Sequence, residues 1–453
     1  MKRKEKLDDR KKMNLLKKII MCGVGLVILE LVLMAIIFVY REFNIDYVDG
    51  LNDVEIIDDG YIAVGSSNFS NSRYVSKKTY NHTIVETGKN EEIIALQAKI
   101  VKYDSDQNII WEKTYDCDYD SEFFSVLPVS DGYVAVGSYV YEYEQIDLNT
   151  RDGLIVKYDT DGNVVWESNY QVLGDTEFYD VIETDDGYVA VGQSIYENME
   201  LGNHTTGGGV IVKYNKENGK VLARNSYGGN KSGLFNKVLE VEDGYIVCGR
   251  DAANYGVVIK YSKDFDRGIK DLGAISEKII WNRTFSNTDE AGFTDMFING
   301  DKIYLSGAVN VSDLKDEEGN TIFQYDAGIV VYNTKGDYLN KYSFGGTGFD
   351  RYNSMLLDDN KIIVVGSSMS RDIEIDGYPD GESQNAILMI YNLDGELLEK
   401  NYYGGQKKDL FSKVVKEDDK YLVVGTSNSK LGLLGHDYKV LWMHYNNKLE
   451  NID

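Results

Sequence analysis

Oxygen-bearing side chains alternate along one short segment, "RDIEIDGYPDGES", which runs from Arg371 to Ser383. The spacing approaches the calcium-loop pattern, in which oxygen ligands stand at alternate positions and a glycine allows the chain to bend. The twelfth position, where such loops carry Glu, is Ser383, and Glu382 comes one residue early. The segment therefore predicts either a calcium site or an acidic surface loop. The candidate calcium ligands are Asp372, Glu374, Asp376 and Asp380.

Tyrosine and acidic side chains are concentrated in three variable segments, residues 139–147, 194–200 and 373–380. Tyrosine gives a broad contact area with a hydrogen-bonding tip at little entropic cost. Such a surface suits a basic protein, a cationic polymer, or a glycan bound together with calcium. The candidate ligand-binding residues are Tyr139, Tyr141, Tyr143, Tyr196 and Tyr378.

Carboxylates in the first of these segments define an alternative function. Glu142, Glu144 or Asp147 could serve as acid and base in a hydrolase or lyase acting on surface glycans. That chemistry needs two carboxyl groups about 5–10 Å apart around a pocket. The sequence has no G-x-S-x-G motif, and its four His are scattered, so we assign no catalytic residue. A clamp for a substrate carboxylate would draw on Arg151, Arg250 and Arg371.

The elements that must position these residues are repeated along the chain. The pattern apolar–apolar–Gly recurs at spacings of 72, 55, 57, 58, 59 and 59 residues. A period in the fifties is typical of one β-propeller blade of four short strands. Seven copies predict an all-β fold, a seven-bladed β-propeller of four-stranded blades. The repeat glycines are Gly65, Gly137, Gly192, Gly249, Gly307, Gly366 and Gly425.

Each repeat divides into strands and turns in the same way. "FYDVIET" from Phe178 alternates in character, and the turn "DDG" at residues 185–187 leads into the apolar strand "YVAVG". The turn "DTDGN" then joins two further strands. We expect Asp159 and Asp161 to bond their own hairpin backbone and not a metal. The last repeat lacks an outer strand, and we expect residues near Arg41–Ile45 to complete, or compete to complete, the seventh blade.

These units resemble bacterial β-propeller repeat proteins, namely the pyrroloquinoline-quinone-type repeats and the surface repeats that end in Tyr-Gly-Gly. The resemblance covers almost all of residues 41–453 and concerns architecture, because propellers carry unrelated activities. The outer-strand Trp of such repeats is present at Trp111, Trp166 and Trp281. A quinone pocket with metal ligands is not recognisable, so no quinone is expected. The segments that carry the resemblance include "KYDTDGNVVW" (157–166), "KYDSDQNIIW" (102–111) and the Gly-Gly pairs at 228–229, 345–346 and 404–405.

A basic and then an apolar segment precede the repeats. Residues 1–18 hold nine Lys and Arg against three Asp and Glu, and residues 19–40 contain a single charged residue, Glu30. This order predicts a cytoplasmic tail, an uncleaved transmembrane signal anchor at 19–40, and an extracellular propeller at 41–453 on a single-pass cell-membrane protein. Glu30 either contacts a partner helix in the membrane or is a tolerated neutral carboxyl. The formal net charge of −26 repels phosphate backbones, so no nucleic-acid partner is expected.

Overall fold

A computed structural model of the chain describes most of the residues from Gly50 to Ile452, all within one compact unit, Val48–Asp453. The predicted tail (1–18) and membrane span (19–40) lie outside the described residues. Within the described part, the search for a helix with the length and apolar character needed to cross a bilayer finds none. The described ranges are 50–67, 73–80, 83–93, 96–115, 117, 120–143, 148–170, 174–198, 204–227, 233–251, 253–266, 278–285, 288–311, 324–373, 375, 384–405, 407–427 and 439–452.

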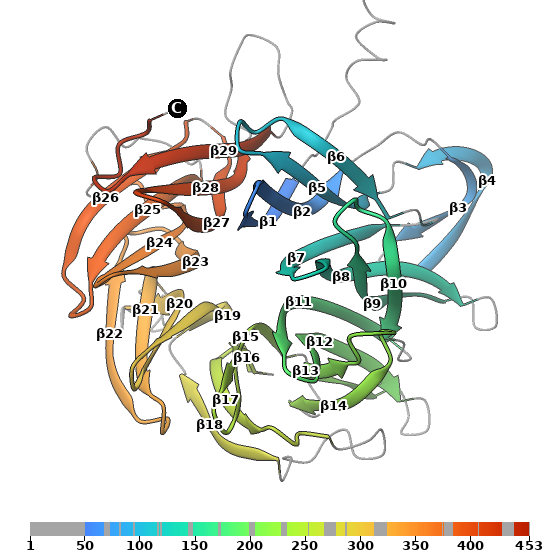
Figure 1. Ribbon diagram of the computed structural model, residues 1–453, viewed down its shortest axis with the longest axis horizontal. Helices are drawn as coiled ribbons and strands as arrows, with labels where there is room; N and C mark the ends of the chain where they lie inside the picture. Colours follow the sequence, from blue (N-terminus) through green and yellow to red (C-terminus); the bar gives the residue numbers. More distant parts are fainter. Residues whose placement is uncertain are drawn as a thin grey trace, which may run out of the picture. The chain divides into compact units, whose positions relative to one another are not determined.

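Antiparallel sheets stand side by side around a common axis, and the chain passes through them in order (Figure 1). The prediction of a seven-bladed propeller with four-stranded blades is confirmed. In each blade the first strand lies nearest the axis. Blade 1 consists of β1 (Gly50–Ile57), β2 (Gly60–Ser67), β5 (Gln97–Asp104) and β6 (Ile109–Thr114); blade 2 of β7 (Ser121–Val129), β8 (Gly132–Tyr143), β9 (Leu148–Tyr158) and β10 (Val164–Tyr170); blade 3 of β11 (Gly174–Thr184), β12 (Gly187–Asn198), β13 (His204–Tyr214) and β14 (Val221–Tyr227).

The remaining blades repeat this order. Blade 7 has three strands among the described residues, and the predicted completing segment Arg41–Ile45 lies outside them. Blade 4 consists of β15 (Leu234–Val241), β16 (Gly244–Arg250), β17 (Gly256–Ser262) and β18 (Ile279–Phe285); blade 5 of β19 (Thr288–Asn299), β20 (Lys302–Asn310), β21 (Tyr325–Asn333) and β22 (Tyr338–Phe344); blade 6 of β23 (Asp350–Asp358), β24 (Lys361–Ser368), β25 (Asn385–Asn392) and β26 (Leu397–Tyr403); blade 7 of β27 (Asp409–Glu417), β28 (Lys420–Ser427) and β29 (Lys439–Asn446).

One hairpin departs from the expected four-stranded plan. The segment after Gly65 contains β3 (Arg73–Tyr80) and β4 (Thr83–Ile93), which pair with each other. Strand β4 also pairs with β9 at Thr83 and Leu148. An insertion in blade 1 thereby extends the sheet of blade 2.

The second and third strands of each blade are buried on both faces, as the repeated "YVAVG" predicts. In β12, residues from Tyr188 to Val191 are at most 1% exposed. Each of these strands packs between two neighbouring blades, so both of its faces are apolar. The hydrophobic clusters accordingly span pairs of blades, and one of them joins β1 and β2 of blade 1 to β28 and β29 of blade 7. Apolar burial thus closes the ring of blades.

Three outer-strand tryptophans link blades 1, 2 and 4 to the turn of the following blade. Trp111 Nε1 donates to the Thr160 carbonyl at 3.2 Å, and Trp166 Nε1 donates to the Lys216 carbonyl at 2.9 Å. Trp281 makes the same contact with Thr334. Within the turn of blade 2, the Asp159 Oδ1 atom accepts the N–H groups of Asp161 and Asn163. Asp159 therefore has the expected turn-forming role, and Asp161 contributes its backbone N–H.

Candidate functional site

A β-bulge in the innermost strand of every blade determines which side chains reach the axis. In blade 3, the register of β11 on β12 shifts between Phe178 and Asp180, opposite the repeat glycine Gly192. A Cβ on Gly192 would lie 1.8 Å from the Glu177 carbonyl oxygen, so this position admits only glycine. The same shift opposite the repeat glycine occurs in all seven blades. The repeated glycine therefore exists because the bulged strand passes directly over it.

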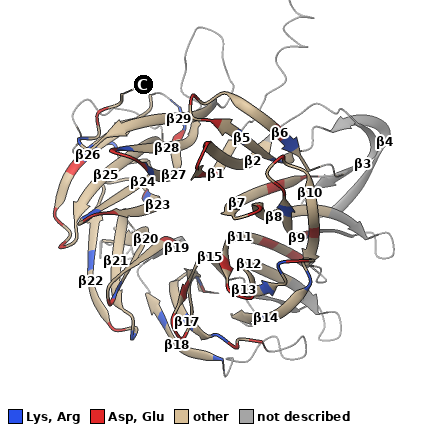
Figure 2. Ribbon diagram, viewed as in Figure 1, with Lys and Arg blue, Asp and Glu red and all other residues tan. Residues whose placement is uncertain are grey.

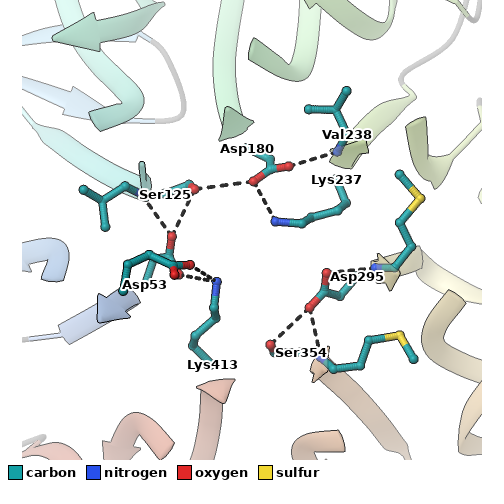
Figure 3. Close-up of polar contacts among 12 residues, drawn as sticks. Asp53, Ser125, Asp180, Lys237, Val238, Asp295, Ser354 and Lys413 are labelled. Atoms are coloured by element: carbon teal, nitrogen blue, oxygen red, sulfur yellow. Dashed lines mark hydrogen bonds and ion pairs between the residues drawn. The ribbon is translucent and has the colours of Figure 1, made fainter. Parts of the chain in front are cut away.

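The residue that follows the bulge is polar in every blade, and the seven together surround the axis. We call this set the axial ring (Figure 3). Its members lie twelve positions before the repeat glycine of their blade, as Asp53 does before Gly65 and Lys413 before Gly425. The axial ring consists of Asp53, Ser125, Asp180, Lys237, Asp295, Ser354 and Lys413.

The aspartates of the axial ring each bridge to the following blade. Asp53 Oδ2 accepts the Ser125 hydroxyl and the Val126 N–H, each at 3.0 Å. Asp180 binds Lys237 Nζ at 2.9 Å and accepts the Val238 N–H at 2.9 Å. The third aspartate contacts blade 6 in the same way: Asp295 Oδ2 accepts the Ser354 hydroxyl at 3.1 Å and the Met355 N–H at 2.9 Å.

Blade 7 completes the ring with a cation. Lys413 Nζ lies 2.8 Å from Asp53 Oδ1 and 2.9 Å from Glu55 Oε1, both in blade 1. Burial alone would raise the pKa of Asp53, but Lys413 and the Val126 N–H outweigh it and hold that pKa below its ordinary value. Burial disfavours the charged form of Lys413, yet Asp53 and Glu55 raise its pKa well above the ordinary value. This ion pair is therefore charged at neutral pH.

The axial ring contains three carboxylates and two ammonium groups: Asp53 pairs with Lys413 and Asp180 with Lys237, while Asp295 accepts the Ser354 hydroxyl and backbone N–H groups. Burial raises the pKa of Asp180, although Lys237 and the Val238 N–H oppose that rise. A search of the described part of the chain finds no group of three or more His, Cys, Asp or Glu side chains placed to hold a metal. Chemically, this arrangement ties blades together and offers no activated nucleophile.

A second group of charged and aromatic side chains comes from β1, β7, β9, β11 and β12 and consists of Asn52, Glu122, Arg151, Glu177, Tyr179 and Gln193. We call it the mouth cluster. Arg151 Nη1 binds Glu177 Oε1 at 2.8 Å, while Glu177 Oε2 accepts the Tyr179 hydroxyl at 2.5 Å and the Gln193 amide at 3.0 Å. The Glu122 Oε1 atom accepts the Asn52 amide at 2.9 Å.

The electrostatics of the mouth cluster are strongly perturbed. Burial raises the pKa of Glu122, and the nearby Glu177 carboxylate adds to this while Asn52 and Arg151 oppose it. Burial and Glu177 raise the pKa of Tyr179 well above its ordinary value, and the charges of Arg151 and Arg250 counteract part of that rise. Two of the three predicted clamp arginines therefore lie near one tyrosine and two carboxylates. Arg371 belongs to blade 6 and is not among these groups.

The predicted tyrosines fall in differing positions. Tyr139 is 7% exposed, and its hydroxyl accepts the Asn169 amide at 2.8 Å, so its ring packs in the core. Tyr141 and Tyr143 belong to β8, and Tyr196 belongs to β12. The structure does not describe the side chains of these three residues, and Tyr378 lies outside the described residues altogether. Ligand binding by these residues stays a prediction.

The predicted calcium ligands and acid–base residues are described only in part. Asp372 is exposed, and its Oδ1 accepts the N–H and the hydroxyl of Thr347 at 2.7 and 2.9 Å. Glu374, Asp376 and Asp380 lie outside the described residues, so the calcium loop also stays a prediction. Of the alternative acid–base residues, Glu142 lies in β8 with its side chain not described, and Glu144 and Asp147 are outside the described ranges.

The axial ring was not predicted from the sequence, although a signal for it exists. A polar or charged residue stands twelve positions before each repeat glycine, in a strand whose next buried positions are apolar. Ser, Asp and Lys alternate at this position, so a search for a repeated residue type misses it. Only the bulge, which turns two successive side chains to the same side, explains why the position is polar.

Comparison with known proteins gives a likeness of fold. No family model matches the sequence, and no curated protein sequence matches it significantly. Solved structures with similar folds include the Pan2 WD40 domain of Neurospora crassa (10% identity, TM-score 0.45, 84% of this chain and 87% of that one). BamB from Moraxella catarrhalis is similar at 10% identity and a TM-score of 0.39, over 83% of this chain and 96% of that one. Kuenenia stuttgartiensis hydrazine synthase is similar at 9% identity and a TM-score of 0.45, over 80% and 92%. At this level of identity, the likenesses concern the propeller fold alone.

Proposed function

We propose that this chain is a membrane-tethered extracellular propeller that binds a protein or another ligand through its variable hairpins. The observation that carries the proposal is that the blades are joined firmly at the axis, whereas the hairpins of blades 2 and 3 extend further than that of blade 4. The charged groups of the axial ring bind residues of the neighbouring blades, which makes the propeller a rigid support. In blade 3, β12 and β13 pair as far as Asn198 and His204, whereas in blade 4 the pairing of β16 and β17 ends at Arg250 and Gly256.

Blade 2 has the same extension as blade 3. Strands β8 and β9 pair as far as Tyr143 and Leu148, and this hairpin carries the Tyr- and acid-rich segment. Recognition residues are frequently placed on variable segments held by a rigid scaffold. Asp and Glu occur in all blades and are not gathered in one sector (Figure 2), which favours a basic partner or a cation-assisted glycan over an anionic one.

The test compares the full-length chain with two shortened versions. In one, the β8–β9 hairpin is shortened to the length of the β16–β17 connection; in the other, the β17–β18 connection of blade 4 is shortened as the control. Chemical cross-linking on intact cells is followed by identification of the captured molecules. The proposal expects partners that are captured by the natural chain and the control and lost with the shortened β8–β9 hairpin. Equal capture by all three chains would refute it.

The membrane anchor and the side of the membrane need a separate test. The basic residues 1–18 and the apolar residues 19–40 support a cytoplasmic N-terminus and an external propeller. Protease added to intact cells should digest the propeller and spare an epitope at the N-terminus. If the propeller is digested only after the cells are lysed, the orientation is wrong.

A second candidate function is glycan hydrolysis or cleavage at the mouth cluster, favoured by one observation. A carboxyl with a raised pKa, Glu122, lies near Glu177, which is held by Arg151 and Tyr179. Two neighbouring carboxyl groups, one of them in an environment that raises its pKa, are the pairing that glycoside cleavage uses. Glu122→Gln should then abolish release of sugars from surface polysaccharide, and unchanged release by this variant excludes the mouth cluster as the source.

A further inference from the structure

Two carboxylates from neighbouring blades converge where blade 5 meets blade 6. Asp326 stands near the start of β21, and Asp350 begins β23. A Cβ built on Gly345 would lie 2.3 Å from Asp350 Oδ2 and 2.7 Å from Asp326 Oδ1. Both side chains therefore reach the same point, directly over the first glycine of the segment Phe344-Gly345-Gly346.

The Asp350 carboxylate is buried and only half satisfied. Its Oδ2 atom accepts the Ser370 hydroxyl at 2.6 Å and the Gly346 N–H at 3.0 Å. The side chain is 0% exposed, and its Oδ1 atom has no hydrogen-bond partner among the described residues. A buried carboxylate oxygen is costly unless a donor or a cation meets it.

Asp326 is held close to this charge. Its Oδ1 atom lies 3.5 Å from the Gln324 amide, and Ser343 also donates to the carboxylate. Burial and the Asp350 carboxylate raise the pKa of Asp326 to about 6, while Lys341 opposes that rise. The donors that meet the two carboxylates are neutral groups: Gln324 and Ser343 at Asp326, and Ser370 and the Gly346 N–H at Asp350.

The next junction has the same construction with one difference. At blades 6 and 7, a Cβ on Gly404 would lie 2.3 Å from Asn385 Oδ1 and 2.8 Å from Asp409 Oδ2. The Gly405 N–H donates to Asp409, as the Gly346 N–H does to Asp350. Asn385 thus takes the place of Asp326. Because Asn is neutral, the pair Asn385–Asp409 has one carboxylate fewer than the pair Asp326–Asp350.

We propose that Asp326 and Asp350 form a calcium-binding site between blades 5 and 6. Calcium takes oxygen ligands in flexible numbers and completes its shell with carbonyl oxygens and water, so two carboxylates suffice for a weak site. We expect a dissociation constant of about 10⁻⁴ to 10⁻³ M, the range of extracellular calcium modules. The site joins two blades and borders the predicted loop at 371–383, because Ser370 donates to Asp350 and Asp372 lies beside Gly346.

Isothermal titration of the purified full-length chain with calcium chloride tests this site, with three variants. Asp326→Asn reproduces the residue of the neighbouring junction and should remove one bound calcium per chain. Asn385→Asp supplies the missing carboxylate at blades 6 and 7 and should add one. Asp372→Asn, in the predicted loop, should leave the calcium at Asp326 and Asp350 in place.

The results separate the alternatives. Loss of one calcium in Asp326→Asn, or the gain of one in Asn385→Asp if the first variant does not fold, supports the site. The site is ruled out if the natural chain binds no calcium at 10-fold above the expected range. It is equally ruled out if Asp372→Asn loses calcium while Asp326→Asn binds as the natural chain does, because the loop alone would then be the ligand.

Discussion

Lys413 in β27 and Asp53 in β1 form an ion pair of 2.8 Å that joins the last blade to the first. Both side chains are mostly buried, at 18% and 6% exposed. The pair lies within the axial ring, and a hydrophobic cluster shared by the same two blades packs beside it. Closure of this propeller therefore combines apolar burial with one charged contact at the axis.

Lys413→Met should destabilise the propeller by about 3 kcal/mol, because removing one partner leaves the buried Asp53 charge uncompensated. Lys263→Met is the matched control, since Lys263 pairs with Glu240 at 3.3 Å and is 52% exposed. Its loss should cost less than about 1 kcal/mol. Urea unfolding of the two variants measures the difference in free energy of unfolding. Similar decreases for both variants would mean that the Lys413–Asp53 pair stabilises the fold no more than an exposed ion pair does.

Gly219→Ala should be more destabilising than Gly300→Ala. Both glycines have left-handed backbones, with φ of 66° and 62°. Alanine at either site carries a backbone cost of roughly 1–2 kcal/mol. At Gly219 the added Cβ would also lie 2.5 Å from Trp166 Cε3, whereas nothing lies within 4 Å of it at Gly300. Overpacking against Trp166 should add about 1–3 kcal/mol. Equal free energies of unfolding for the two variants would show that the Trp166 ring does not rest on this turn.

Two carboxylates should change the pH dependence of stability in opposite senses. The folded-state pKa of Glu122 is raised, so its ionisation lowers stability as pH rises above the ordinary value of 4.5. The hydrogen bond from Lys213 lowers the pKa of Asp186, so Asp186 stabilises the fold above the ordinary value of 3.8, and this is lost in acid.

Thermal unfolding from pH 3 to pH 8 measures both effects. Relative to the natural chain, Glu122→Gln should gain stability as pH increases, and Asp186→Asn should lose it. The Gln side chain keeps the acceptor that binds Asn52, which limits other consequences of the change. Difference curves with the same sign for both variants would contradict these assignments.

Features that depend on the residues of a single repeat were predictable from the sequence, and features formed by residues of different blades were not. The repeat glycines, the hairpin turn at Asp159 and the outer-strand tryptophans were predictable because each depends on residues close together in one repeat. The axial ring and the Asp326–Asp350 pair were not, since each member comes from a different blade. Their meeting depends on the bulge and on the register between blades, which no single repeat displays. The hairpin β3–β4 was missed because an insertion interrupts the period there.

The outer edge of β29 provides the test of the predicted fourth strand in blade 7. Tyr445 bridges to Asn451, and the Ile452 N–H donates to the His444 carbonyl at 3.0 Å. The C-terminal end of β29 is therefore covered by the residues that follow it. If residues 41–45 cover the remainder, replacing them with Gly and Ser should speed amide hydrogen exchange at Lys439–Met443 while exchange at His444–Asn446 stays unchanged. Protected amides become exchangeable when their strand partner is removed. Identical exchange at Lys439–Met443 in both chains would show that another segment, or none, completes the blade.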